Sequence, residues 1–289
     1  MPGPLAALRS QVGHSRGGHP MSFLGHDGLK GPWYYYPYIF AMKTHLTLAL
    51  LALLGLLTAK AWRNPVALAA ILLVLLSCTM KISGGPRYFL VLYMLAAMLA
   101  GLAVERALAW PWSNRSVNQD RLFKALAVGV VASASLLLTL RSWPELFTHT
   151  SPLWGGDAEG YRYADANYDW GQGLYEAFRA ADRGGLQLKS VVYLSNGDPF
   201  YGIPPERGVV NLDRLDRVLP TLRGHQVAVA AGLVYSFGRQ DPEFGPLYRA
   251  FNRLPPVRRL TDTFFLFDLQ DDPTFESFDR IVQAERKSR

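Results

Sequence analysis

Three basic residues stand in the aliphatic first half of the chain where their charges could bind a phosphate: Lys43, Lys81 and Arg87. Lys81 and Arg87 flank a Ser-Gly-Gly-Pro turn, and Tyr88 follows it. A guanidinium group can form two parallel hydrogen bonds with a phosphate, whereas an ammonium group offers a point charge. The same cations could anchor the chain at a membrane surface, with their apolar stems in lipid. Composition alone favours anchors, and an anionic lipid head group is the alternative partner.

A second group of polar residues lies in the later half. Asp165, Asn167, Asp169 and Glu176 occupy the first, third, fifth and twelfth positions of a calcium-loop template. That template needs glycine at its sixth position, where this chain has Trp170. We therefore predict no metal site here, and we expect Asp169 or Asn167 to cap the helix that follows.

Other catalytic and metal-binding patterns are missing from the sequence. It contains no Gly-x-Ser-x-Gly elbow, no Gly-x-x-x-x-Gly-Lys loop and no His-Glu-x-x-His pair. Its single cysteine, Cys78, excludes a disulfide framework and a cysteine-based zinc site. His14, His19 and His26 lie in a Gly- and Pro-rich segment without partners that would build a metal site. We expect no metal and no cofactor, and no catalytic residue is assigned.

Charge and hydropathy divide the chain into two halves. It has 289 residues, 49% of them hydrophobic and 18% charged, and a net charge of +7. Residues 1–141 hold thirteen Lys and Arg against three Asp and Glu, whereas residues 142–289 hold seventeen against twenty. The basic excess accompanies long aliphatic runs, which argues against a nucleic-acid partner. It favours a half embedded in a membrane lipid bilayer and joined to a soluble half.

Four apolar segments in the first half predict a bundle of about four transmembrane helices. A helix needs roughly 20 residues to cross the hydrocarbon core, and the second segment is shorter than that. The first contains Lys43 and His45, so we expect its polar positions to face protein instead of lipid. Four buried helices of a soluble protein are the alternative, although the runs are apolar on all sides. The segments are 38–59, 66–80, 88–104 and 123–140.

Basic residues in the short connections predict the orientation of these segments. Five of them lie in the connections after the first and third segments: Lys60, Arg63, Arg106, Arg115 and Arg121. By the positive-inside rule these connections are cytoplasmic. We therefore predict a multi-pass protein of the cell membrane whose N-terminal stretch, 81–87 loop and C-terminal domain are extracytoplasmic. Since the N-terminal stretch has no signal-peptide apolar region, we expect the chain to be the C-terminal part of a longer membrane protein.

An aromatic cluster, Trp33-Tyr34-Tyr35-Tyr36, precedes the first apolar segment. A belt of aromatic rings at the level of the lipid head groups would fully account for these residues. With the preceding run from Gly18 and the Gly-Pro-Arg-Tyr turn at 85–88, however, it resembles the polyprenyl-phosphate-sugar-dependent glycosyltransferases of the GT-C type. The most similar members are bacterial proteins related to protein O-mannosyltransferases and to the lipid A aminoarabinose transferase.

A second stretch, 163–172, strengthens this resemblance. It is similar to the Asp-Ser-Asn-x-Asp-Trp-Gly-Gln signature that opens the extracytoplasmic domain of many such proteins. Tyr193 and the turn at 198–203 continue the similarity. The residues of this chain that match the signature are Asp165, Asn167, Asp169, Trp170 and Gln172.

The resemblance implies an integral membrane enzyme that moves a sugar from a polyprenyl-phosphate donor to an acceptor at the outer membrane face. Such a transfer needs a base for the acceptor hydroxyl and cations for the departing phosphate. The candidates for binding the donor phosphate are Lys43, Lys81, Arg87 and Tyr88. His19 and Tyr36 are candidates for contact with donor or acceptor, although a structural role is the commoner case for a loop histidine.

The family's catalytic carboxylate raises a difficulty. It lies in the first extracytoplasmic loop, and Asp27, the one carboxylate before the first apolar segment, does not match that position. The chain is therefore predicted to lack its own catalytic carboxylate. The alternative function is a non-catalytic membrane-anchored module whose outer domain binds a glycan, a lipid or a protein.

The second half predicts a small extracytoplasmic α/β domain over residues 142–270, because helical and β-type patterns alternate there. Residues 271–289 are polar and predict a terminal helix or a frayed tail. Residues 1–36 are expected to form an extracytoplasmic loop segment, and residues 37–141 the transmembrane helices. The expected helices of the domain are 173–183 and 209–222, and its expected strands are 190–194, 226–235 and 263–269.

Overall fold

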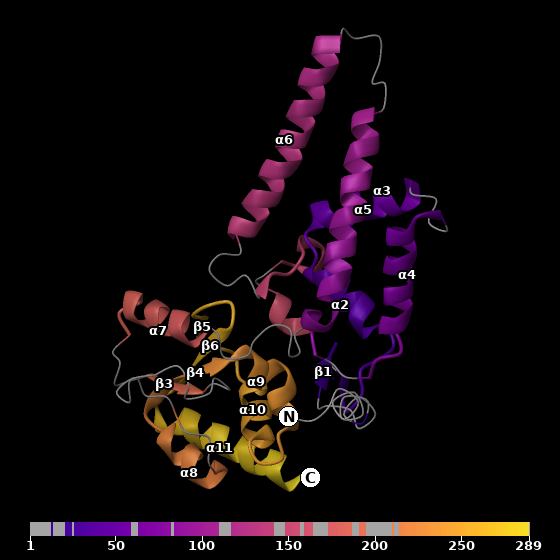
Figure 1. Cartoon of the computed structure of the whole chain (residues 1–289). Coiled ribbons are helices and arrows are strands. Elements are labelled where there is room, and N and C mark those ends of the chain that lie inside the picture. Colours follow the sequence, from indigo (N-terminus) through magenta and orange to yellow (C-terminus); the bar gives the residue numbers. More distant parts are fainter. Residues whose placement is uncertain are drawn as a thin grey trace, which may run out of the picture. The chain divides into compact units, whose positions relative to one another are not determined.

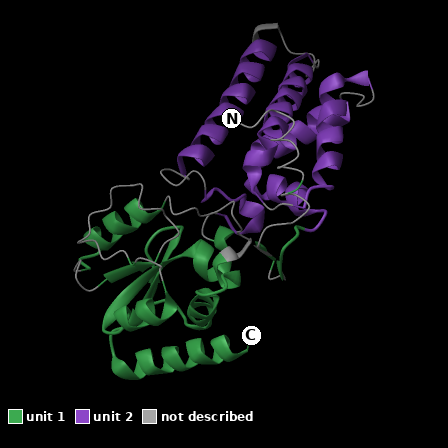
Figure 2. Ribbon diagram, turned by 60° about the horizontal axis from the view of Figure 1, so that its bottom comes forward, with its two compact units in different colours: residues 1–31, 158–289 green, residues 32–157 purple. Residues whose placement is uncertain are grey.

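The structure of the chain is a computed structural model with two compact units, coloured separately in Figure 2. Unit 1 consists of Met1–Gly31 and Ala158–Arg289, and unit 2 of Pro32–Asp157. Unit 2 is therefore an insertion between two separate stretches of unit 1. The structure describes residues 13, 21–24, 26–58, 63–81, 84–109, 117–141, 148–156, 159–163, 173–186, 191–194, 210 and 214–288.

Unit 2 is built from helices (Figure 1). They are α2 (Tyr35–Lys43), α3 (Leu46–Thr58), α4 (Pro65–Ser77), the 3-10 helix η2 (Pro86–Phe89), α5 (Leu90–Ala109), α6 (Val117–Arg141) and the 3-10 helix η4 (Pro152–Trp154). In the described chain, two stretches are long and apolar enough to cross a membrane, 86–109 and 119–141. Helices α2 and α3 make a third candidate if they are counted as one bent span. At about 1.5 Å per residue, α4 is only roughly 20 Å long, so the four predicted spans become two or three candidates.

The prediction of one continuous helix in the first apolar segment is wrong. Helices α2 and α3 are separated at Thr44 and His45 and form an angle of 118°. Thr44 has an extended backbone, and its hydroxyl donates to the Phe40 carbonyl. The Ser151 amide donates to the Met42 carbonyl at 2.7 Å. These two donors replace backbone amides that a continuing helix would have supplied, so the break leaves both carbonyls bonded.

Helix α3 approaches α5 very closely at a glycine. A Cβ added to the buried Gly55 would lie 1.9 Å from the carbonyl oxygen of Leu99. Small residues permit this kind of backbone contact between apolar helices. Helix α6 is bonded to α3 through the hydroxyls of Thr47 and Ser135, which are 3.1 Å apart. None of the apolar window of α6 is buried, so its aliphatic side chains face outwards.

Unit 1 contains a four-stranded mixed sheet in the order β3–β4–β6–β5. Strands β3 and β4 are parallel, whereas β6 is antiparallel to β4 and to β5. The strands are β3 (Val191–Leu194), β4 (His225–Ala230), β5 (Arg258–Arg259) and β6 (Phe264–Leu269). The helices are η5 (Gly160–Tyr163), α7 (Leu174–Arg183), α8 (Leu215–Thr221), α9 (Ala231–Tyr235), η9 (Phe237–Gln240), α10 (Gly245–Arg253) and α11 (Asp272–Lys287). The expected small α/β domain is therefore present.

Helices and loops cover both faces of this sheet. The register places Tyr193 and Leu266 on one face, on either side of Ala228. Phe178 of α7 packs edge-on against Tyr193 with 4.7 Å between the ring centroids. Phe267 points to the other face and lies 4.8 Å from Phe251 of α10. Burial on both faces explains why β3 and β6 read as nearly continuous apolar runs.

One expected strand of the domain is shorter than predicted, and the C-terminal segment adopts one of its two predicted forms, the helix. The expected strand over 226–235 ends at Ala230, and the next five residues form helix α9. The polar C-terminal segment is a helix of 16 residues, α11, and the Asp271 side chain at its start accepts a hydrogen bond from the Thr274 amide. Its side chains Phe278 and Val282 are fully buried in the core of unit 1. The segment is therefore an integral helix of the domain and not a frayed tail.

An N-terminal hairpin also belongs to unit 1. Strands β1 (Met21–Phe23) and β2 (His26–Gly28) pair antiparallel, and both Met21 and Phe23 are buried. The Gln240 side-chain amide donates to the Met21 carbonyl, and Arg239 pairs with Asp27 at 3.5 Å. The hairpin, which was expected to be part of a loop segment, is thus bonded to η9 in the C-terminal part of the chain.

Candidate functional site

The connection between α4 and η2 is a turn whose shape requires two glycines. Gly85 has φ 71° and ψ −169°, a conformation that is open to glycine and strained for other residues. A Cβ on Gly84 would lie 1.9 Å from a ring carbon of Tyr88. Pro86 then begins η2, where its fixed φ suits the first helical position. We call residues 84–89 the glycine turn.

Tyr36 holds the glycine turn against α2. Its side chain is buried, and its hydroxyl accepts a hydrogen bond from the Gly84 amide at 3.4 Å. The Tyr36 ring also packs on Phe89, with 4.4 Å between the centroids. Tyr36 was a candidate for contact with donor or acceptor, and its contacts in the structure are those of a residue that fixes the turn.

Two of the predicted cations are exposed at the glycine turn or next to it. Lys81 precedes it, and Arg87 lies within it with its guanidinium carbon 5.4 Å from the centroid of the Tyr88 ring. Stacking on an aromatic face limits the orientations of a guanidinium group. The described carboxylates of unit 2 are Glu105 and Asp120, near the end of α5 and the start of α6. The glycine turn lies before the start of α5, so the described charges at this end of unit 2 are basic.

Lys43 lies at a different place from the other two cations. It is half-buried in the last turn of α2, roughly 10 Å along the helix from Tyr36. A cation is favourable there because the helix C-terminus carries partial negative charge. The structure therefore brings together Tyr36, Arg87 and Tyr88, with Lys81 nearby in the chain, and places Lys43 at the helix break.

Sequence reasoning missed a histidine pair at this break. The rings of His45 and His149 are 4.0 Å apart between centroids and inclined by 32°. Around them, Thr148, Thr150 and Ser151 are buried. The sequence hints at this pair only through the Thr-His-Thr-Ser run at 148–151, soon after the last apolar segment. The pair joins the break between α2 and α3 to a distant part of the chain.

Several predicted site residues lie outside the described residues: His19, Asp165, Asn167, Asp169, Trp170 and Gln172. Their proposed roles stay predictions. Within the described ranges, no group of three or more His, Cys, Asp or Glu side chains could hold a metal ion.

Unit 1 has a polar pocket of about 370 Å³ between α8 and α11, and several of its polar side chains bond to their neighbours. Arg223 donates to Asp272 at 2.9 Å, and Gln283 donates to Asp279 at 3.1 Å. The glycine turn combines two exposed basic side chains, Lys81 and Arg87, with the Tyr88 ring, and it is the candidate site that we develop. No family model matches this chain, and no curated protein or solved structure matches it either.

Proposed function

We propose that this chain is an integral membrane protein that supplies the donor-phosphate-binding part of a glycosyltransferase using a polyprenyl-phosphate sugar. The observation that carries the proposal is the glycine turn, which Tyr36 fixes and which presents Arg87 beside the Tyr88 ring. The resemblance of the Gly-Pro-Arg-Tyr turn to those enzymes gives the class of ligand.

The exposed aliphatic side chains of α5 and α6 support a membrane location. Leu90 and Met94 of α5 are 61% and 67% exposed, and Leu136 and Leu137 of α6 are 60% and 66% exposed. Soluble monomeric proteins rarely expose apolar areas of this extent. In a bilayer the same side chains would contact lipid, and both helices are long enough to cross it.

Donor binding follows from the chemistry of the turn. A phosphate at the turn would meet the guanidinium group of Arg87, which can bond two oxygens at once, and the mobile charge of Lys81. The polyprenyl tail would lie on the apolar helix surfaces. A complete transfer also needs a base for the acceptor hydroxyl, and no carboxylate is described near the turn. We therefore assign donor binding, and not the whole reaction, to this chain.

The test is binding of a radiolabelled polyprenyl phosphate to the full chain in phosphatidylcholine nanodiscs. Loss of a charge-assisted contact is worth about 1.5–3 kcal/mol, so Arg87→Ala should weaken binding by roughly 10- to 100-fold. Arg87→Lys should recover part of this loss. The control is Arg141→Ala, which removes an exposed cation at the end of α6, outside the turn; it should change affinity less than twofold.

Unchanged affinity of the Arg87→Ala variant would show that Arg87 is only a membrane anchor. If the folded wild-type chain does not bind polyprenyl phosphate at all, the donor-binding role is wrong. The non-catalytic membrane-anchored module would then be the better description.

A further inference from the structure

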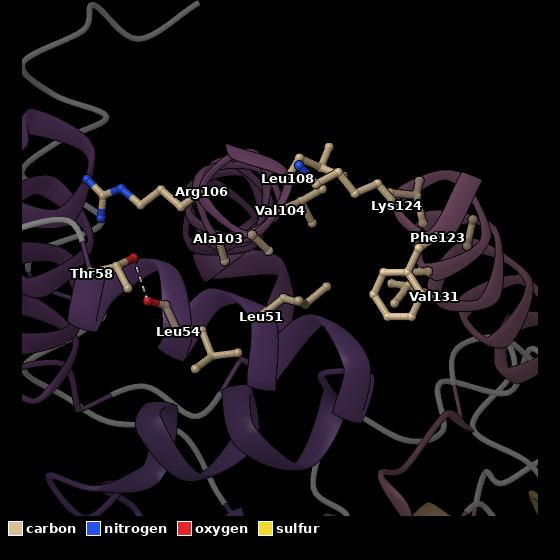
Figure 3. Close-up of a pocket in the computed structure, with 14 residues that line it drawn as sticks. Leu51, Leu54, Thr58, Ala103, Val104, Arg106, Leu108, Phe123, Lys124 and Val131 are labelled. Carbon is tan, nitrogen blue, oxygen red and sulfur yellow. Dashed lines mark hydrogen bonds between the residues drawn. The ribbon is translucent and has the colours of Figure 1, made fainter. Parts of the chain in front are cut away.

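An apolar groove lies between α3, α5 and α6 in unit 2 (Figure 3). Its volume is about 590 Å³, within the roughly 300–1,000 Å³ of sites that hold small molecules. Leu51 of α3, Val104 of α5 and Phe123 and Val131 of α6 form part of its walls. The groove lies where α3 and α5 end and α6 begins, away from the glycine turn, which precedes the first residue of α5.

The walls of the groove offer almost no hydrogen bonds to an occupant. Among the described residues that line it, Thr58 is the one uncharged polar side chain. Its hydroxyl donates within α3, to the carbonyls of Leu54 at 2.8 Å and Gly55 at 3.1 Å. An occupant of the deep part must therefore be hydrocarbon, because a polar group there would lose its bonds to water without replacement.

Two cations border this apolar space. Figure 3 shows Lys124 extending from α6 toward Leu108 of α5, while the Arg106 side chain extends on the side of Thr58. Arg106 is exposed, and Lys124 forms an ion pair with Asp120 at 2.7 Å. Both charged side chains among the described residues that line the groove are basic, so its border attracts an anion. A ligand that complements it has an anionic head and an apolar tail.

We infer that this groove binds an anionic phospholipid. One acyl chain lies among the apolar side chains, and the lipid phosphate lies at the border of the groove that carries Arg106 and Lys124. Basic pockets between membrane helices on the cytoplasmic side bind anionic head groups in this way, and the positive-inside rule places these cations on that side. The inference rests on the membrane location proposed above. It does not depend on the donor site, because the glycine turn lies at the other end of α5.

Native mass spectrometry of the full chain in detergent can test this with two added lipids, dipalmitoyl phosphatidylglycerol and dipalmitoyl phosphatidylcholine. Each cation near a membrane surface is worth about 1 kcal/mol, and Lys124 is already paired, so we expect roughly fivefold tighter binding of phosphatidylglycerol. The double variant Arg106→Gln/Lys124→Gln should bind both lipids equally.

A matched pair of tryptophan variants tests the groove itself. Ala127 and Ala125 are both exposed on α6, but only Ala127 lines the groove. Ala127→Trp should reduce binding of both lipids severalfold, whereas Ala125→Trp should leave it unchanged.

Equal binding of the two lipids by the wild-type chain, or unchanged binding by Ala127→Trp, would overturn the inference. A second copy of the chain in the groove would appear as a dimer that Ala127→Trp disrupts, and this outcome would overturn it too. The two sites can be separated because Arg87→Ala should leave phosphatidylglycerol binding intact. The Arg106/Lys124 double variant should leave polyprenyl-phosphate binding intact, so either site can fail while the other holds.

Discussion

Replacement of Gly55 by alanine should loosen the packing of α3 on α5. The new Cβ would lie 1.9 Å from the Leu99 carbonyl oxygen, whereas ordinary contact begins at about 3.4 Å. The atom that it meets belongs to the backbone, so no change of rotamer can relieve the clash. The two helices must therefore move apart over the length of their contact.

The size of the effect follows from two opposing contributions. Alanine gains up to about 1 kcal/mol over glycine in helix propensity. Overpacking in a dense interior costs about 1–3 kcal/mol, and a gap of about 0.5–1 Å already removes a quarter to a half of a dispersion contact. The clash forces the two helices further apart than a gap of about 0.5–1 Å. We therefore take the upper part of the range of about 1–3 kcal/mol as the cost of overpacking. Gly55→Ala should be less stable than wild type by about 2 kcal/mol.

Gly101→Ala is the matched control. Gly101 also lies inside an apolar helix, but a Cβ added there meets no heavy atom within 4 Å. This variant should therefore show only the propensity gain, so the two variants should differ by about 3 kcal/mol. The assay is unfolding of the full chain in one detergent, followed by far-UV circular dichroism. Equal stability changes in the two variants would refute the close approach of α3 and α5.

Two further predictions concern unit 1. Glu285 is buried and accepts hydrogen bonds from Arg249 and Arg253. Chemical denaturation should show that Glu285→Ala is less stable than wild type by about 3 kcal/mol, because two arginines lose their buried partner. A denaturation midpoint equal to that of wild type would contradict a stabilising role of Glu285. The Thr274 amide holds the pKa of the Asp271 carboxyl below its usual range, so the stabilisation it gives is present above about pH 3.9 and is lost as the pH falls through the lower folded pKa. Asp271→Asn keeps a capping oxygen without this titration, so its melting temperature should fall less than that of wild type on acidification, and equal falls would refute the assignment.

The strands of the α/β domain could be predicted because their residue types repeat a pattern that local rules recognise. Strands β3 and β6 are short apolar runs rich in β-branched and aromatic residues. Helix α9 could not be predicted, because Ala231, Gly232 and Leu233 continue the apolar run of β4 without interruption. Periodicity alone does not separate a buried helix from a buried strand, and the change of direction depends on tertiary packing.

The candidate site was predictable in its residue types and not in its arrangement. The Gly-Gly-Pro turn with Arg87 and Tyr88 is a local feature, and the structure shows why both glycines are needed. The polar residues Lys43 and His45 stood out within the first apolar segment, but the sequence could not show that the helix breaks there. The residues that contact the helix break are Ser151, which bonds to Met42, and His149, which packs on His45. Both come from a distant part of the chain.

The insertion of unit 2 into unit 1 fixes an order of events during synthesis. The hairpin with Met21 and Phe23 is made before any helix of unit 2, and its partner η9 is made after all of them. At about 5–20 residues per second, the roughly 200 residues between Gly28 and Phe237 take about 10–40 s to translate. During this interval the two apolar side chains have no partner from η9. Unit 1 therefore cannot complete its folding until all of unit 2 has left the ribosome, and the waiting hairpin is open to chaperones and proteases.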